Sequence, residues 1–545
     1  MNVAIGALAL GVAVTGAAPD TVPLYDDLGD HHYEITTSEP LVQAYFDQGL
    51  RLYYAFNHQE AIRSFRAAQE LDPECAMCWW GEALAWGPNI NLPMDSASGV
   101  AAHAAARRAL EALEASEARE GTSERERAFV EALARRYAPD APADRAALDS
   151  AYARAMEDVS RRWPDDPEAA VLYAEAEMTL RPWDYWTEDE EPYPGIPEAL
   201  AKLEAVMDRN PDHPGACHFY IHAVEKVDPD RAVPCAERLA DLMPGAGHLV
   251  HMPGHIYIRV GRYLDAIRAN EHAVHADETY IQDQRPGMGV YTAGYYPHNY
   301  DFMAFAATMA GRSGQAVEAA RKMSEVVPEE MHRAPGMTFV QHFLTRPLQI
   351  YVRFGVWEEV LRTAEPAEDL HHARGMWHYA RGRALAATGD LDGAADELER
   401  LRELAEGPEL AGVALEFNES QHVLRIGAAV LGGRLAEARG EVDRAVEKLR
   451  EAVRLEDALL YGEPPEWTVP VRHELGDVLL AADRAEEAER VYREDLERFR
   501  ENGWSLIGLA RALEAQGRQA EADEVRERFR GAWSASDLEI AASTF

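Results

Sequence analysis

Hydrophobic residues recur every three to four positions along almost the whole chain, in segments rich in Ala, Leu, Glu and Arg. This spacing places the apolar side chains on one face of an α-helix. Short breaks containing Gly, Asp or Pro separate the segments, as at helix ends. No segment shows the alternation of apolar and polar residues that is typical of a β-strand. The pattern therefore predicts an all-α protein.

The helical segments also repeat. Small or apolar residues and a proline recur at the spacing of positions 8, 20, 24, 27 and 32 in a unit of about 34 residues. The matching residues are Gly49, Ala61, Phe65, Ala68 and Pro73; Gly254 and Ala266; Ala304, Ala316, Ala320 and Pro328; Leu348, Val360 and Ala364; Gly382, Ala394 and Leu398; Gly476 and Ala488; Ala510 and Ala522. This spacing resembles the tetratricopeptide repeat (TPR). The resemblance implies a right-handed α-solenoid of TPR-like helical hairpins.

The N-terminus predicts export. Residues 1–14 form a short apolar run, and the small residues of 15–19 follow it, as in a signal peptide cut near Ala17 or Ala18, although the usual leading Lys or Arg is missing. No later run reaches the ~20 apolar residues of a membrane span. We therefore expect a periplasmic or secreted protein with a signal peptide at 1–18, an extended segment at 19–40, a solenoid with a His-rich groove at 41–365, and C-terminal TPR-like repeats at 366–545.

The charge is strongly negative. Asp and Glu total 95 against 54 Lys and Arg, a formal net charge of −41. Such a surface repels nucleic acid and anionic lipid, which argues against both as partners.

Histidines are concentrated in one part of the chain. Residues 213–298 hold nine of the 20 histidines. His248, His251 and His255 are spaced by three and four, so one helix face carries all three. His218 and His222 share a face in the preceding helical pair, and Glu225 lies one turn further on.

The repeat resemblance implies where these histidines point. In TPR proteins the first helix of each hairpin lines a concave groove. On that register His248, His251 and His255 take groove positions 2, 5 and 9, His298 and Asp301 take positions 2 and 5 of a later repeat, and His342 takes position 2 of another.

Converging neutral imidazoles are ligands for a transition metal. The predicted ligand set is His218, His222, His248, His251, His255, His298 and Asp301. So many imidazoles suit copper, zinc or iron better than calcium or magnesium, which prefer oxygen ligands. The alternative is that these histidines are packed or capping residues without a metal.

Other residues are predicted to line or cover the groove. Tyr257, Arg259 and His342 fall near the histidines on the same register. The aromatic loop at residues 181–186 carries Trp183 and Trp186, which we expect to cover the groove. Several long loops in a solenoid are simple surface insertions, so this role is a hypothesis.

Four cysteines become two possible disulfides in an exported protein. Cys75 and Cys78 form a CxxC motif, but Trp79 stands where covalent haem attachment needs histidine, and no second CxxC completes a zinc ribbon. We predict the disulfides Cys75–Cys78 and Cys217–Cys235, the latter between facing helices of one hairpin.

Longer strings resemble one particular group of proteins. Residues 217–225 and 245–257, together with the Cys-Ala-Met-Cys segment at 75–78 and the Pro-Trp-Asp-Tyr-Trp loop at 182–186, are similar to those of a group of exported bacterial TPR proteins. The resemblance implies fold and export and leaves the chemistry open.

Two functions follow. The first is a groove that binds a transition metal, with metal-dependent catalysis if a coordination position stays open. The second is an interaction scaffold that binds a partner protein, a peptide or a small molecule, with structural histidines. GxSxG, GxxxxGK[ST] and HExxH motifs are absent from the sequence, so it points to no common hydrolase, P-loop or zincin chemistry.

Overall fold

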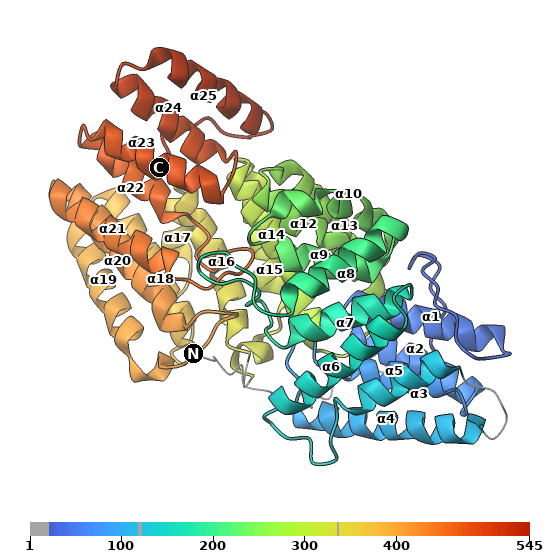
Figure 1. Ribbon diagram of the computed structural model, residues 1–545. Coiled ribbons are helices and arrows are strands. Elements are labelled where there is room, and N and C mark those ends of the chain that lie inside the picture. The colour runs from blue at the N-terminus through green and yellow to red at the C-terminus, as the bar shows by residue number, and fades with distance from the viewer. Residues whose placement is uncertain (1–20, 118–122, 335–336) are drawn as a thin grey trace. The chain divides into compact units, whose positions relative to one another are not determined.

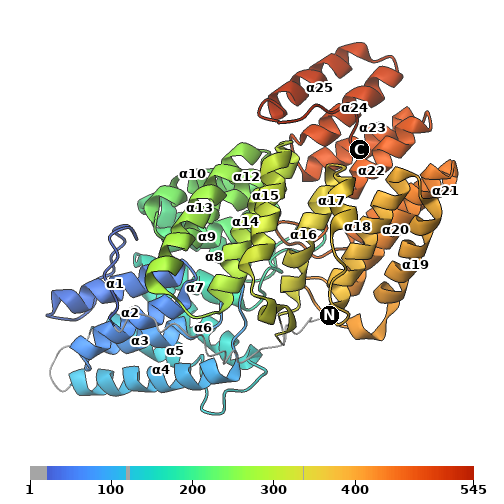
Figure 2. The ribbon, with the colours of Figure 1, turned by 180° about the vertical axis from the view of Figure 1, so that it is seen from behind.

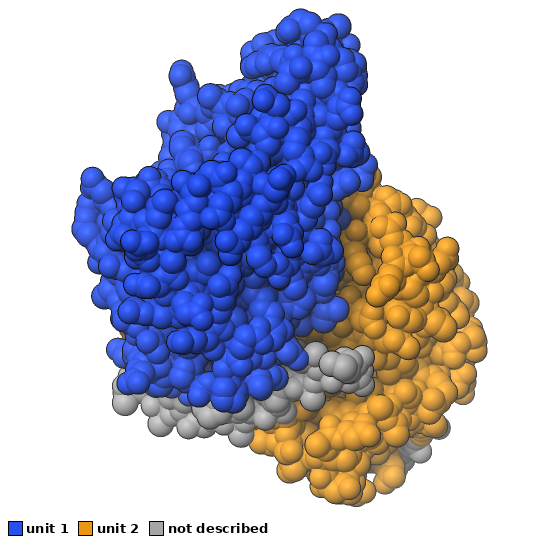
Figure 3. All heavy atoms as spheres, turned by 90° about the vertical axis from the view of Figure 1, so that its left-hand side faces the viewer, with its two compact units in different colours: residues 1–4, 257–271, 293–545 blue, residues 5–256, 272–292 orange. Residues whose placement is uncertain are grey.

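The computed structural model describes residues 21–117, 123–334 and 337–545. The predicted signal peptide at 1–18 lies outside these residues, so export stays a prediction. Residue contacts divide the chain into two compact units, which Figure 3 colours separately. Apart from the gaps, the described part of unit 2 is 21–256 and 272–292, and that of unit 1 is 257–271 and 293–545. The predicted boundary between the His-rich solenoid at 41–365 and the C-terminal repeats at 366–545 also stays a prediction.

Unit 2 consists of helices joined by turns and loops (Figure 1). Its helices are α1 (Pro40–Tyr54), α2 (His58–Leu71), α3 (Ala76–Ala85), α4 (Ser96–Glu117), α5 (Glu124–Ala134), α6 (Ala146–Arg162), α7 (Pro167–Thr179), α8 (Ile196–Arg209), α9 (Pro214–Val224), η1 (Pro229–Ala232), α10 (Val233–Leu242) and α11 (Gly247–His251). α12 (Pro253–Arg259) and α13 (Tyr263–Gln284) contribute residues to both units, and the π-helical turn η2 (Tyr291–Tyr295) lies at the next boundary.

Unit 1 also consists of paired helices, and Figure 2 shows α18 to α21 as neighbouring hairpins. Its helices are α14 (Tyr296–Met309), α15 (Ser313–Val326), η3 (Glu329–Arg333), α16 (Phe339–Arg353), α17 (Trp357–Arg362), α18 (His371–Thr388), α19 (Leu391–Glu406), η4 (Pro408–Leu410), α20 (Ser420–Ala438), α21 (Val442–Asp457), α22 (Val471–Ala481), α23 (Ala485–Arg498), α24 (Gly503–Ala515) and α25 (Gln519–Ala532).

Successive helices pack in pairs within each unit. α1 packs on α2, α14 on α15, α18 on α19, α20 on α21, and α24 on α25. Side-chain caps begin several of them: the Asn57, Asp390 and Asn502 side chains accept backbone N–H groups at the starts of α2, α19 and α24. Across the described ranges β-pairing is limited to isolated bridges, such as Trp186 with Pro192. The predicted all-α class of TPR-like hairpins is therefore confirmed.

None of the helices formed by the described residues is long and apolar enough to cross a membrane.

The glycine positions of the repeat have a packing reason. In unit 2 an ideal Cβ on Gly49 would lie 2.6 Å from the Phe65 ring, and one on Gly81 would lie 2.3 Å from it. In unit 1 Gly476 and Gly508 approach the ring of Tyr492 in the same way, at 2.4 and 2.2 Å. In both places the aromatic ring follows the first glycine and precedes the second by the same number of residues. The repeat thus uses glycine to admit a ring between helices.

Replacing Gly508 by alanine is expected to lower the free energy of unfolding by about 1–3 kcal/mol, because the new methyl group overpacks the buried Tyr492 ring. That ring has little freedom to move, since its hydroxyl is hydrogen-bonded to Ser543 Oγ at 2.7 Å. Urea titration measures the change. The matched control is Gly531→Ala in α25, where nothing lies within 4 Å of the added Cβ; alanine there should be neutral or stabilising by up to about 1 kcal/mol. Equal responses of the two variants would contradict the packing argument.

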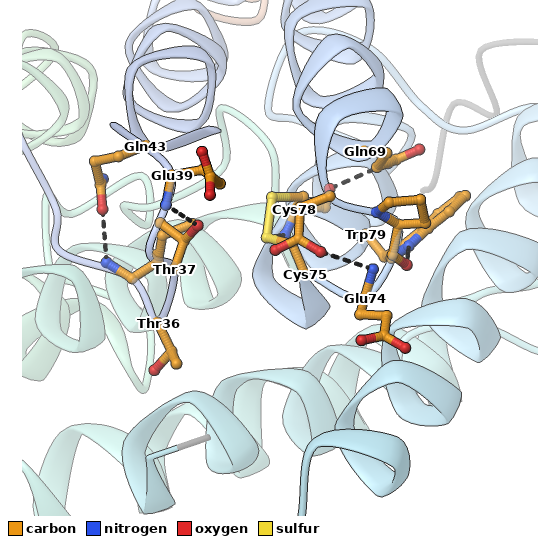
Figure 4. The surroundings of a disulfide bond; sticks show 12 residues. Thr36, Thr37, Glu39, Gln43, Gln69, Glu74, Cys75, Cys78 and Trp79 are labelled. Atoms are coloured by element: carbon orange, nitrogen blue, oxygen red, sulfur yellow. Dashed lines mark hydrogen bonds between the residues drawn. A yellow bond between two sulfur atoms is a disulfide. The ribbon is translucent and has the colours of Figure 1, made fainter. Parts of the chain in front are cut away.

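The predicted Cys75–Cys78 disulfide is present at the start of α3 (Figure 4). Cys75 is the N-cap residue, and its Sγ accepts the backbone N–H of Cys78 at 3.1 Å. Gln69 of α2 donates to the Cys78 carbonyl at 3.2 Å. The disulfide therefore fixes the turn between α2 and α3.

The predicted Cys217–Cys235 disulfide is wrong: both residues are buried free thiols. The thioether of Met207 packs against both, with its Sδ 3.1 Å from Cys235 Sγ and 3.9 Å from Cys217 Sγ. Cys217 Sγ also donates to the Pro211 carbonyl at 3.6 Å. The prediction placed the two cysteines correctly on neighbouring helices, but a sulfur-rich packing contact takes the place of the bond.

Candidate metal centre

Five histidines of unit 2 come together from two stretches of chain. α9 carries His218 and His222, while α11 and the first turn of α12 carry His248, His251 and His255. The spacings of three and four residues place each set on one helix face. We call these five residues the imidazole cluster. Every member is buried, with no more than 3% of its surface exposed.

The five imidazole rings of the cluster are arranged in a circle, in which each ring lies next to two others. Neighbouring ring centroids are separated by 5.0 Å for His218–His222, 5.2 Å for His222–His255, 4.8 Å for His255–His251, 5.7 Å for His251–His248 and 5.0 Å for His248–His218. His248, His251 and His255, predicted to converge, thus lie beside His218 and His222 in unit 2. Their predicted convergence with His298 and Asp301, and the binding of a metal, stay predictions.

Hydrogen bonds fix the tautomers of His218 and His222, and a short nitrogen–oxygen contact orients His255. His218 Nδ1 lies 2.6 Å from the Tyr54 carbonyl oxygen. The Glu225 carboxylate bridges two others, with Oε1 3.3 Å from His222 Nδ1 and Oε2 2.9 Å from His255 Nδ1. Carbonyl and carboxylate oxygens only accept, so each Nδ1 carries the proton and each Nε2 presents its lone pair. This support by an oxygen acceptor is typical of histidines that bind metals.

Three members of the cluster are neutral. Burial lowers the pKa of His218, His222 and His248 well below its ordinary value, and neighbouring imidazoles lower each pKa further. Neutral imidazole is the form that binds metal. Nε2 of His218 and Nε2 of His222 have no hydrogen-bond partner among the described residues, although buried polar atoms normally have one.

The nitrogen spacing fits a first-row transition ion. Two tetrahedral ligands at about 2.0–2.1 Å from an ion are separated by about 3.3–3.4 Å. His251 Nε2 and His255 Nε2 are 3.0 Å apart. One ligand atom each from His218, His222 and His248 lie within 4.8 Å of one another, as do atoms of His222, Glu225 and His255. The residues present therefore fit a metal ion after small side-chain adjustments.

Two aromatic side chains flank the cluster, and both have an uncommon backbone conformation. Phe56, in the turn between α1 and α2, has φ 55° and lies 4.4 Å from the His218 ring and 5.2 Å from the His248 ring. Trp183 has φ 64° and lies 5.0 Å from the His222 ring. A positive φ in a bulky residue is strained and is enriched at functional sites. The sequence pattern identified Trp183 but gave no signal for Phe56.

The loop that carries Trp183 is fixed at two points. Trp183 Nε1 donates to Asn91 Oδ1 at 3.0 Å. Trp186 Nε1 donates at 2.8 Å to the carbonyl of Ala223, the residue after His222. Of the two predicted covering residues, Trp183 thus packs against the cluster, while Trp186 anchors the loop to α9.

The remaining predicted ligands belong to unit 1. On α14, His298 packs against Phe302 at 4.9 Å between ring centroids, and its participation in a metal site stays a prediction. Asp301 is held by Arg346 at 2.6 Å, with both side chains buried. This ion pair gives Asp301 a structural partner within its own unit.

The predicted groove residues Arg259 and Tyr257 also lie in unit 1. Arg259 is 3.6 Å from Glu463 and stacks on the Tyr461 ring at 5.6 Å. The Tyr257 side chain is largely buried and stacks with Arg262 at 4.4 Å. Neither arrangement tests their role in binding a ligand.

His342, the last predicted groove residue, is buried on α16 beside His372 of α18, with their rings 6.0 Å apart. Burial, then Arg346 and His372, lower the pKa of His342 well below its ordinary value. Burial lowers the pKa of His372 to about 3. This pair is therefore neutral.

His372 should make the stability of the protein depend on pH. Its pKa is lower in the folded chain than the ~6.5 of the unfolded chain, so its contribution is complete above pH 6.5 and is lost as pH falls toward 3. The contribution lost between pH 7 and pH 5 is about 2 kcal/mol. His372→Asn removes the titration and keeps a partner for Ser420 Oγ, 2.8 Å from His372 Nδ1. Urea titrations at the two pH values should give a smaller difference in the variant by that amount; an unchanged difference would show that His372 is not the group responsible.

A second group of potential ligands was missed by the sequence prediction. Glu168 Oε1 lies 2.9 Å from His31 Nε2 and 3.1 Å from His213 Nε2, and Glu168 Oε2 accepts a hydrogen bond from the Tyr54 hydroxyl. His213 Nδ1 accepts the Ala216 N–H at 3.2 Å, so the His213 proton sits on Nε2 and points at Glu168.

This arrangement suits an ionised carboxylate better than a metal, because the nitrogen that faces Glu168 already carries a proton. Burial acts to raise the pKa of Glu168, but His213 and His31 outweigh it and hold that pKa well below its usual value. Tyr54 connects the two groups: its hydroxyl bonds Glu168 and its carbonyl bonds His218. The group therefore lies at the start of α9 and is linked to the imidazole cluster through Tyr54.

The similarity of the chain to known proteins is distant. No protein-family model and no curated protein matches the chain. Among solved structures, human IFIT1 in a dimer with m7Gppp-AAAA is 15% identical, with 92% of each chain covered and a TM-score of 0.33. A kinesin light chain with TPR-like repeats from Podosopora anserina is 20% identical, with 46% of this chain and 98% of that chain covered and a TM-score of 0.23. The paired helices within each unit define a protein of the TPR-like helical-repeat class.

Proposed function

We propose that the imidazole cluster binds one copper, zinc or iron ion, held by His218, His222 and His248. The observation that carries this proposal is the fixed orientation of the cluster, in which His218 and His222 present Nε2 atoms without a hydrogen-bond partner among the described residues. His251 and His255 bond to one another through Nε2 and lie beside this set.

Three imidazoles leave a coordination position for water or a substrate, and an ion so held supplies Lewis acidity that lowers the pKa of bound water. The chain contributes the rest. Glu225 holds the tautomers of His222 and His255. Phe56 and Trp183 cover the rings and keep bulk water from the cluster. This division of roles favours a metal-dependent enzyme over a saturated storage site.

Metal analysis of protein purified without an affinity tag tests the proposal. We expect the purified protein to contain about one equivalent of copper, zinc or iron per chain. Protein stripped of metal should take up one equivalent of such an ion from a chelator complex. A chain that takes up none of the three ions, yet keeps its helical circular dichroism, would favour the interaction scaffold.

The scaffold alternative is favoured by the TPR-like fold, which commonly binds peptides and proteins. A carboxylate-clamping groove needs available Lys or Arg. Arg259, the one groove arginine predicted from the sequence, faces Glu463 and Tyr461, which makes it a weak clamp. The partner class is therefore open to a protein, a peptide or a small molecule, and the negative net charge disfavours nucleic acid.

We also propose that the protein is exported, as the resemblance to exported bacterial TPR proteins implies. The support is the apolar run at 1–14 and the Cys75–Cys78 disulfide, a bond that persists in oxidising compartments. N-terminal sequencing of protein recovered from the periplasm or medium should begin close to residue 18. Recovery of the full-length chain from the cytoplasm alone would overturn this.

A further inference from the structure

Unit 2 contains a second feature besides the imidazole cluster: a cavity of about 670 Å³. One wall is the N-terminal segment at 23–28, a second is the connection from α10 to α11, and a third is the C-terminal half of α13. This volume falls in the range of small-molecule sites. No histidine of the imidazole cluster lines it.

The cavity has a negative lining. Asp26, Asp27, Asp241 and Asp283 belong to its walls, and its lining residues include no Lys or Arg. None of the four aspartates forms an ion pair with a described residue. His272 and His275 of α13 are the remaining basic side chains of the lining. The electrostatic potential inside therefore favours a cation.

Three tyrosines supply the aromatic part of the lining: Tyr25, Tyr280 and Tyr291. Their hydroxyl groups are already engaged. Tyr25 and Tyr280 donate to the two carboxylate oxygens of Glu60, at 2.8 and 3.2 Å, and Tyr291 donates to Asp277 Oδ1 at 2.6 Å. What the tyrosines offer a ligand is thus their aromatic surface, which attracts organic cations.

A glutamine narrows the ligand class. Gln284, the last residue of α13, lines the cavity, is only 8% exposed, and its Oε1 has no hydrogen-bond partner among the described residues. A buried amide oxygen needs an N–H or O–H donor. A tetraalkylammonium ion has no such donor. A primary or secondary ammonium group has a positive charge and also N–H groups to donate.

We propose that this cavity binds a small organic ammonium compound that carries N–H groups, the class to which linear polyamines belong. The carboxylates neutralise its charge, the tyrosine rings pack on its methylene groups, and Gln284 Oε1 accepts one of its N–H donors. The site is independent of the metal proposal, because the two share no lining residue.

Isothermal titration of the full chain with spermidine at 150 mM salt tests the proposal. Wild-type protein should show saturable binding, and tetramethylammonium, which has no N–H group, should bind about tenfold more weakly or worse. Asp241→Asn with Asp283→Asn should weaken spermidine binding by at least about tenfold. Both aspartates are exposed, so this variant keeps its fold.

Two further variants distinguish binding in the cavity from non-specific attraction of a cation to the negatively charged protein. Gln284→Leu retains every charge and should also weaken spermidine binding by about tenfold. The matched control is Asp392→Asn with Asp396→Asn on exposed positions of α19, which removes the same charge elsewhere and should bind as wild type does. Absence of saturable spermidine binding, or equal losses in the cavity and control variants, would overturn the proposal.

Discussion

Replacing His222 by alanine is expected to lower the affinity of the protein for its transition metal by at least about 100-fold. Loss of a supporting residue costs about 10–100-fold, and loss of a ligand costs more. His222 belongs to both groups of potential ligands in the cluster, with His218 and His248 and with Glu225 and His255. The measurement is competition with a chelator of known affinity.

Two companion variants define that result. His103→Ala removes a half-buried histidine of α4 in the same unit and should leave the affinity unchanged. Glu225→Gln should weaken binding by about 10–100-fold, because an amide offers one acceptor oxygen where the carboxylate serves two rings. Wild-type affinity in the His222 variant would exclude the cluster as the metal site.

The double change His251→Ala with His255→Ala locates the ion within the cluster. If His218, His222 and His248 hold it, one equivalent is still bound, with affinity lowered by about tenfold or less through lost packing and altered tautomers. Complete loss of metal in this double variant would move the ion to the His251–His255 side. Circular dichroism confirms that both proteins keep their helices.

Much of the fold could be predicted because the repeat pattern is a packing rule. The sequence shows this rule at three positions. Gly49 lacks the side chain that would keep two helices apart, Phe65 fills the space between them, and Pro73 marks the end of the second helix. The 16-residue steps from Gly476 to Tyr492 and from Tyr492 to Gly508 repeat that rule in the other unit. Contacts between distant segments follow no such rule.

The candidate site was predictable in part for the same reason. Spacings of three and four residues place His218 with His222, and His248 with His251 and His255, without any tertiary information. Sequence spacing does not reveal what each side chain meets. The thioether of Met207 between two thiols, and the positive φ that turns Phe56 toward His218, arise from tertiary packing.

Asp301 is the clearest example of a side chain whose contacts the sequence does not reveal. A carboxylate one turn from a histidine suggests a metal ligand until its partner is known. In the folded chain it pairs with the fully buried Arg346. Arg346 Nε and Nη1 have no hydrogen-bond partner among the described residues. Asp301 therefore makes a compensating contact with a buried guanidinium, and we expect this contact to stabilise unit 1.

Asp301→Ala is accordingly expected to lower the free energy of unfolding by about 3–5 kcal/mol, the cost of leaving a buried charge without its partner. Adding Arg346→Met should restore most of the loss, since an apolar pair carries no unpaired charge. Urea titration measures both variants, and metal analysis accompanies it. A single variant that keeps its stability but loses its metal would identify Asp301 as a ligand instead.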